Sequence, residues 1–186
     1  MHAVPANRTR VVLTVFALML ELAHLAWEHF NGGVVAHHLL NRADMPAISN
    51  WWGVLLIPAL TWFLTGLIQR RISKRGGNTF GSARLGPAVL AGFFGALAYG
   101  AVLAVAFTLN HPALTYIFLA LFAISAVVPA YRAEYVLGFV LAMTFTFGAV
   151  LPAIIALVIA SFSRLVHLLS GFVWRFIRHG RSPRAM

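Results

Sequence analysis

Long apolar stretches alternate with short polar and basic segments along this chain. Because a hydrocarbon core of about 30 Å requires about 20 apolar helical residues, these stretches predict membrane spans. We expect spans near residues 11–30, 51–69, 86–109 and 113–130. The remaining apolar block, residues 133–174, is too long for a single span.

Pro152 lies near the middle of this last block, and a proline favours a turn or a kink. Dividing the block there gives spans 133–151 and 153–174. The sequence therefore predicts an all-α, polytopic transmembrane helix bundle of six spans in one integral-membrane domain, residues 1–186. An alternative with five spans, in which a long kinked fifth helix precedes an interfacial helix, stays open because almost no loop separates the last two spans.

The distribution of basic residues favours six spans over five. With a cytoplasmic N-terminus, six spans place twelve basic residues in inner loops and only Arg42 in outer loops, whereas five spans would put the basic C-terminus outside. We therefore expect an inner-membrane protein of a bacterium with both termini in the cytoplasm. The twelve inner residues are Arg8, Arg10, Arg70, Arg71, Lys74, Arg75, Arg84, Arg132, Arg175, Arg178, Arg181 and Arg184.

Composition supports a membrane protein and excludes several other classes. Apolar residues make up 61% of the 186 residues and charged residues 10%, against about 45–50% and about 25% in soluble domains. These values exclude a soluble enzyme or a disordered tail. The absence of cysteine also excludes a disulfide scaffold and a thiolate metal site. The net charge of +10 lies in loops between apolar stretches, so we expect membrane lipid as a partner and no nucleic acid.

Two local patterns concern helix ends and helix packing. Ser49 and Asn50 are a good N-cap for the second span, and the tryptophans that follow suit the outer interface. In the third span a small residue recurs at every fourth position, which lets two helix backbones approach closely. This stripe predicts helix packing and is the expected face of a homo-oligomer. Its members are Ala88, Gly92, Ala96, Gly100 and Ala104.

Two of the four acidic residues, Glu21 and Glu28, lie in the first span with His24 between them. Their spacings of three and four residues place all three side chains on one helix face. An ionisable group at this depth costs at least about 2.5–3.5 kcal/mol. Two carboxylates on one face also repel each other unless a proton, a cation or a metal separates them. A compensating group is therefore expected.

Further side chains of the ligand type follow the first span. Gly32 and Gly33 let the chain fold back, so that two histidines approach the end of the first helix. The density of imidazoles and carboxylates predicts a divalent metal, with Zn or Fe first and Ni or Mn as alternatives. The expected metal ligands are His24, Glu28, His29, His37 and His38, and the expected catalytic residues are Glu21 and Asp44, where Asp44 also orients a histidine.

Simpler interpretations compete with this metal site. His111 is a further candidate ligand, although a single outer-loop histidine is more often a surface residue. Glu21 could be neutral, or it could pair with Arg164 in the last span. Arg132 and Glu134 favour an interfacial salt bridge at an inner turn.

Two further polar residues of the last spans have local explanations. His167 could be satisfied within its own helix, and Thr144 is expected to bond to a carbonyl of its own helix.

The sequence is compatible with four functional hypotheses. The first is a metal-dependent membrane enzyme, of hydrolase or oxygenase type, acting on a lipid-like, hydrophobic small molecule near the outer face. The second is a transporter or channel for a divalent cation or a proton that uses Glu21 and its neighbours. The third is a b-type haem or quinone protein, which lacks paired histidines on facing spans. The fourth is a small subunit or assembly factor of a larger membrane complex.

Overall fold

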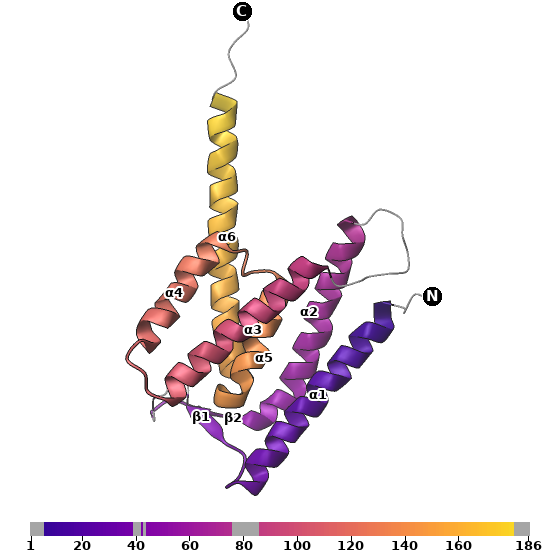
Figure 1. Ribbon diagram of the computed structural model, residues 1–186, viewed down its shortest axis with the longest axis vertical. Coiled ribbons are helices and arrows are strands. Elements are labelled where there is room, and N and C mark those ends of the chain that lie inside the picture. The colour runs from indigo at the N-terminus through magenta and orange to yellow at the C-terminus, as the bar shows by residue number, and fades with distance from the viewer. Residues whose placement is uncertain (1–5, 39–41, 43, 76–85, 181–186) are drawn as a thin grey trace, which may run out of the picture.

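Residues 6–38, 42, 44–75 and 86–180 are described by a computed structural model, in which they form six α-helices and one small hairpin (Figure 1). The hairpin joins the first two long helices, and the last three helices follow the third through short turns. The elements are α1 (Ala6–Phe30), β1 (Ala36–His38), β2 (Ala47–Ser49), the 3₁₀ turn η2 (Asn50–Trp52), α2 (Gly53–Arg75), α3 (Pro87–Thr108), α4 (Leu114–Val127), α5 (Ala133–Phe147) and α6 (Val150–Gly180).

Among the described residues, four helices are long and apolar enough to cross a membrane, in agreement with the expected helix bundle. They cover Asn7–Phe30, Asn50–Lys74, Pro87–Thr108 and Val150–Arg175. By contrast, α4 has 14 residues and α5 has 15, lengths of about 21 Å and about 23 Å at 1.5 Å per residue. Both helices are shorter than the hydrocarbon core of about 30 Å, and shorter than the spans 113–130 and 133–151 expected from the sequence.

The break between the last two helices lies at Gly148, and the break predicted at Pro152 is wrong. Gly148 has φ +67°, a backbone conformation that suits glycine and ends α5. Pro152 lies in the first turn of α6, where its missing N–H costs no helical hydrogen bond. Since α6 is continuous from Val150 to Gly180, the long kinked helix of the five-span alternative is not found in the described residues.

The distribution of side chains is that of a protein whose solvent is lipid. Large apolar side chains such as Phe30 and Val127 are more than four-fifths exposed, while Ser125 and Ser163 are completely buried. Ten polar or charged residues are buried among the described residues. In water this arrangement would expose apolar surface and bury polar groups, so the distribution is the one expected of helices surrounded by lipid.

Helix packing follows from small residues. α1 packs on α2, α2 on α5, α3 on α5, and both α4 and α5 pack on α6. In α5, Gly138 lies directly against the backbone carbonyl of Phe93 in α3, and Gly100 of α3 faces Ala142 and the Phe139 carbonyl of α5. Gly92 and Gly100 of the small-residue stripe therefore pack on α5 of the same chain, while Ala88 of the stripe is exposed.

The bundle has two distinct ends (Figure 1). The start of α1 and the end of α2 lie together at the end that we call the basic end, which holds Arg8, Arg70 and Lys74. The β1–β2 hairpin, the end of α1 and the end of α3 lie at the opposite, hairpin end. α6 begins at the hairpin end and extends beyond the other helices at the basic end. The loop and tail residues Arg84, Arg181 and Arg184 lie outside the described residues.

Replacing Gly138 tests the contact between α3 and α5. A β-carbon at Gly138 would overlap the Phe93 carbonyl, so we expect Gly138→Ala to lower the free energy of unfolding by about 1–3 kcal/mol, the usual cost of overpacking. Gly95→Ala is the matched control on α3, because no heavy atom lies within 4 Å of its added β-carbon. Thermal unfolding in detergent compares the two variants. Equal unfolding temperatures would contradict the proposed contact.

Candidate functional site in a membrane-level groove

A groove of about 650 Å³ is lined by four helices of the bundle, and its volume is within the range of about 300–1,000 Å³ that is typical of ligand pockets. Because α1 packs on α2, α3 on α5, and α2 on α5, α1 and α3 form its two walls, and α2 and α5 form its floor. Its lining is mostly apolar. The side chains of Phe16 in α1 and Phe94 in α3 line the groove and are 61% and 59% exposed, so the groove opens sideways towards lipid.

Three ionisable side chains of α1 come together in the half of the groove near the hairpin. Glu21, His24 and Glu28 are all buried, and Glu21 and His24 line the groove. His24 lies between the two carboxylates: its Nδ1 is 3.9 Å from Glu21 Oε2, and its Nε2 is 3.3 Å from Glu28 Oε1. The shared helix face predicted from spacings of three and four residues is therefore confirmed.

Glu28 is held by groups from outside α1. The Asn50 side-chain amide donates a hydrogen bond of 2.6 Å to Glu28 Oε1, and the Val35 N–H donates one of 3.3 Å to Oε2. Sequence reasoning missed this role of Asn50, because Ser49-Asn50 also fits an N-cap. The cap itself is Ser49, whose Oγ accepts from the Trp51 N–H at 3.4 Å. Asn50 thus links the α1 site to the start of α2.

Other polar atoms of the site lack partners. Within the described part of the chain, Glu21 Oε1, both ring nitrogens of His24 and Thr61 Oγ1 are buried with no hydrogen-bond partner. Each such group costs about 1–3 kcal/mol, and native proteins keep few of them without a ligand, a water or a catalytic role. Gly53 leaves room for the Glu21 carboxylate, which packs where a side chain of residue 53 would lie. The site therefore offers unused donors and acceptors to a bound molecule.

The two neighbouring histidines of β1 have different surroundings. Gly32 and Gly33 adopt φ +121° and +103°, which reverses the chain as expected. Adjacent residues of a strand point to opposite faces, so only His37 turns towards the site, where it lies against Gly148. His38 is exposed, and its Nδ1 bonds the Met45 carbonyl at 2.7 Å. His38 therefore does not join the cluster.

The pKa of His37 reflects its position next to α1. Burial lowers the pKa of the His37 imidazole below its ordinary value of 6.5, and the nearby His24 acts in the same direction, while Glu28 opposes both effects. His37 is consequently a neutral imidazole at neutral pH. A neutral ring nitrogen can accept a proton or bind a metal.

The remaining predicted site residues lie apart from this cluster. His29 and His111 are exposed, and the exposed Asp44 pairs with Arg42 at 2.7 Å, so Asp44 does not orient a histidine. Across the described ranges, no group of three or more His, Asp or Glu side chains has an arrangement that could hold a metal ion. The predicted metal centre of five ligands is therefore not found as one cluster.

Two predicted ion pairs are replaced by other contacts. Arg164 is exposed, and its guanidinium lies 5.1 Å from the centre of the Tyr131 ring, so it does not pair with Glu21. Glu134 pairs with Arg71 of α2 at 2.6 Å rather than with its sequence neighbour Arg132.

Two predicted intrahelical bonds are confirmed. His167 Nδ1 bonds the Ser163 carbonyl at 2.8 Å, and Thr144 Oγ1 donates to the Val140 carbonyl at 2.7 Å.

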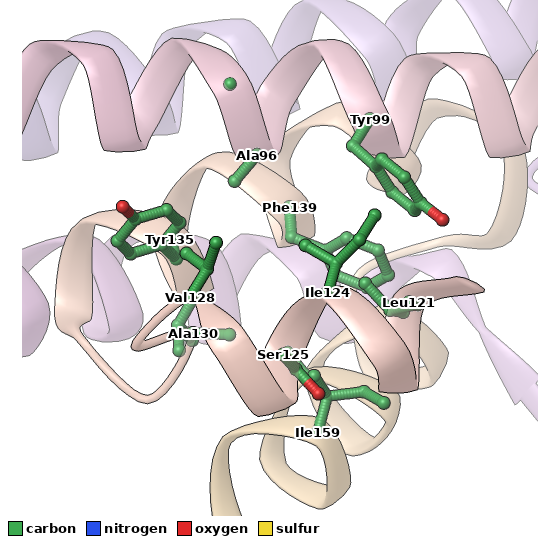
Figure 2. A pocket seen from close by; sticks show the side chains of 13 residues that line it. Ala96, Tyr99, Leu121, Ile124, Ser125, Val128, Ala130, Tyr135, Phe139 and Ile159 are labelled. Atoms are coloured by element: carbon green, nitrogen blue, oxygen red, sulfur yellow. The ribbon is translucent and has the colours of Figure 1, made fainter. Parts of the chain in front are cut away.

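A second cavity of about 270 Å³ lies between α3, α4, α5 and α6 (Figure 2). Two of its polar side chains have hydrogen-bond partners nearby: the Tyr99 hydroxyl donates to the Ile117 carbonyl at 2.5 Å, and Ser125 Oγ donates to the Phe122 carbonyl at 2.9 Å. No Asp, Glu, His, Lys or Arg side chain is among the residues that line it. The larger groove is therefore the candidate functional site.

Comparison of the chain with known protein families, curated proteins and solved structures gave no match. No activity or ligand can therefore be transferred from a relative. The features that bear on function are the groove and the buried side chains of Glu21, His24 and Glu28 at its hairpin end.

Removing the Asn50 amide tests how Glu28 is held. Asn50→Ala leaves Glu28 Oε1 buried without its partner at 2.6 Å, so we expect a loss of about 1–3 kcal/mol in the free energy of unfolding. We also expect faster hydrogen exchange at the Val35 amide, which bonds the same carboxylate. Ser49→Ala is the matched control, because it removes only the weaker bond of 3.4 Å. Equal effects of both variants would contradict a special role for Asn50.

Proposed function

We propose that this protein is an integral membrane enzyme that performs acid–base chemistry on a lipid-like substrate bound in the groove. One observation carries the proposal: Glu21, His24 and Thr61 line an apolar groove that opens to lipid, and each has a buried polar atom without a hydrogen-bond partner in the described part of the chain. An amphiphile can enter the groove from the bilayer between α1 and α3. Its hydrocarbon chain then packs on the apolar lining, and its polar group reaches these polar atoms. Hydrolysis is the reaction class that this arrangement supports best.

Each residue has a distinct role in the proposed hydrolysis. His24 accepts a proton from a water molecule, whose oxygen then attacks the acyl or phosphoryl centre of the substrate. Glu28, fixed by Asn50, lies 3.3 Å from His24 Nε2 and stabilises the imidazolium that forms. The imidazolium then returns the proton to the leaving oxygen. Glu21 accepts a hydrogen bond from the substrate or the water. Such general acid–base catalysis contributes about 10²–10⁴-fold in rate.

A metal at the same site is the second candidate. His24 Nε2 and Glu28 Oε1 are 3.3 Å apart, and two ligands at about 2.0–2.1 Å from one tetrahedral ion lie about 3.3–3.4 Å apart. Zn or Fe, or less readily Ni or Mn, fits this pair, and the neighbouring imidazole of His37 is the nearest further donor of β1. A bound ion would lower the pKa of a bound water and so supply the nucleophile.

The location that we propose is the inner membrane of a bacterium. The positive-inside rule places the basic end, with Arg8, Arg70, Arg71 and Lys74, at the cytoplasm. The Glu21–His24–Glu28 site then lies in the outer half of the membrane, below the β1–β2 hairpin. Water for hydrolysis would reach it from the hairpin end.

Oxygen-18 incorporation tests the enzyme proposal. Proteoliposomes of total bacterial polar lipids are incubated in H₂¹⁸O, and the lipid products are analysed by mass spectrometry. We expect a labelled product with the wild-type protein and a loss of at least about 100-fold with His24→Ala, because the general base is removed. His167→Ala should retain activity, because this α6 histidine does not line the groove and its imidazole bonds the Ser163 carbonyl of its own helix. Absence of a labelled lipid, or full activity of His24→Ala, would contradict the proposal.

Elemental analysis of the detergent-purified protein distinguishes the two candidates. If the ion is part of the site, about one Zn or Fe per chain is expected in the wild type, and its loss in His24→Ala, since that variant lacks one of two ligands. The His37→Ala/His38→Ala double variant tests the contribution of β1, and His29→Ala, altered at an exposed position, should keep the metal. A wild-type protein without metal would rule out the second candidate and leave acid–base chemistry by His24 alone.

A further inference from the structure

The Arg71–Glu134 pair lies at the basic end of the same groove, away from the proposed reaction site. Glu134 is 2% exposed, and its Oε1 accepts a hydrogen bond of 2.6 Å from Arg71 Nη2. Its second oxygen, Oε2, is buried and has no partner among the described residues. Glu134 also lines the groove. The pair therefore presents a hydrogen-bond acceptor to whatever occupies this end.

The surroundings of Glu134 hold its carboxylate in place. It lies in the first turn of α5, where the helix dipole favours a negative charge, and Arg71 supplies a charge-assisted hydrogen bond. Gly92 of α3 provides the space, because a β-carbon there would lie 3.0 Å from Glu134 Cγ. An unused oxygen of a fixed carboxylate needs a donor, preferably a cationic one.

Arg71 lies near the end of α2, where the positive-inside rule places the lipid head groups. It is 28% exposed, and the neighbouring Arg70 and Lys74 on the last turns of α2 are exposed. Arg71 has further N–H donors beyond the one used by Glu134, and a guanidinium binds phosphate oxygens well. Ten residues along α2 separate Thr61 from Arg71, which is about 15 Å of helix. This end is thus distinct from the Glu21–His24 site, although one groove connects them.

We propose that the Arg71–Glu134 pair binds the head group of an aminophospholipid from the leaflet at the basic end. The ammonium of the lipid donates to Glu134 Oε2, its phosphate accepts from Arg71, and one acyl chain lies in the groove between α1 and α3. The alternating charges of the pair match those of a zwitterionic head group, whereas an anionic head group without an amine leaves Glu134 Oε2 unpaired. This binding site does not depend on the reaction proposed at Glu21 and His24.

Native mass spectrometry of the purified protein tests this site with three probes: phosphatidylethanolamine, N-acetyl-phosphatidylethanolamine and phosphatidylglycerol. We expect the wild type to bind phosphatidylethanolamine at least about tenfold more tightly than the other two, since only this lipid supplies a charge-assisted hydrogen bond to Glu134. Glu134→Gln keeps the size of the side chain and should reduce the preference to about one. Arg71→Gln should weaken the binding of all three lipids.

A matched variant separates this result from the proposed enzyme function. His24→Gln alters the other end of the groove and should leave the lipid preference unchanged, even though it removes the proposed general base. Equal binding of the three lipids by the wild type, or an unchanged preference in Glu134→Gln, would overturn the proposal. If Glu134→Gln does not fold, the wild-type ratio of phosphatidylethanolamine to its N-acetyl form decides the question, because these two lipids differ only at the amine.

Discussion

The hydrogen bond from Asn50 to Glu28 is the contact on which the arrangement of the site depends. A carboxylate in a hydrocarbon environment is costly unless hydrogen bonds and opposite charge compensate it. Two groups donate hydrogen bonds to the Glu28 carboxylate: the Val35 N–H, directly before β1, and the Asn50 amide, in the 3₁₀ turn directly before α2. By binding there they also fix where α1 meets the rest of the bundle. The need to satisfy one buried charge thus positions the groove wall, the hairpin and His24 together.

Much of the fold follows from the sequence, because helix length and apolar composition are local properties. The apolar stretches locate the helices, and spacings of three and four residues place Glu21, His24 and Glu28 on one face. The end of α5 differs from the sequence prediction, because the turn at Gly148 depends on the local backbone conformation. A proline within the first turn of a helix looks the same in sequence as one that breaks a helix.

The rest of the site could not be predicted, because it depends on contacts between distant segments. Arg71 and Glu134 are 63 residues apart, so their pairing needs the packing of α2 on α5. From the sequence alone, Asn50 looks like an ordinary helix cap, because its contact with Glu28 depends on the fold. The histidines of β1 were expected to act together, but strand alternation sends His37 inwards and His38 outwards.

Because the groove between α1 and α3 opens sideways, the relevant concentration of a ligand is its concentration in the lipid bilayer. A molecule that arrives through the bilayer diffuses in two dimensions, and its occupancy follows its mole fraction in the lipid phase rather than its amount per volume of water. Weak intrinsic affinity then suffices for a filled groove in a membrane rich in the ligand. Diluting such a ligand with detergent would lower its occupancy of the groove, although the contacts that Phe16 and Phe94 offer would stay the same.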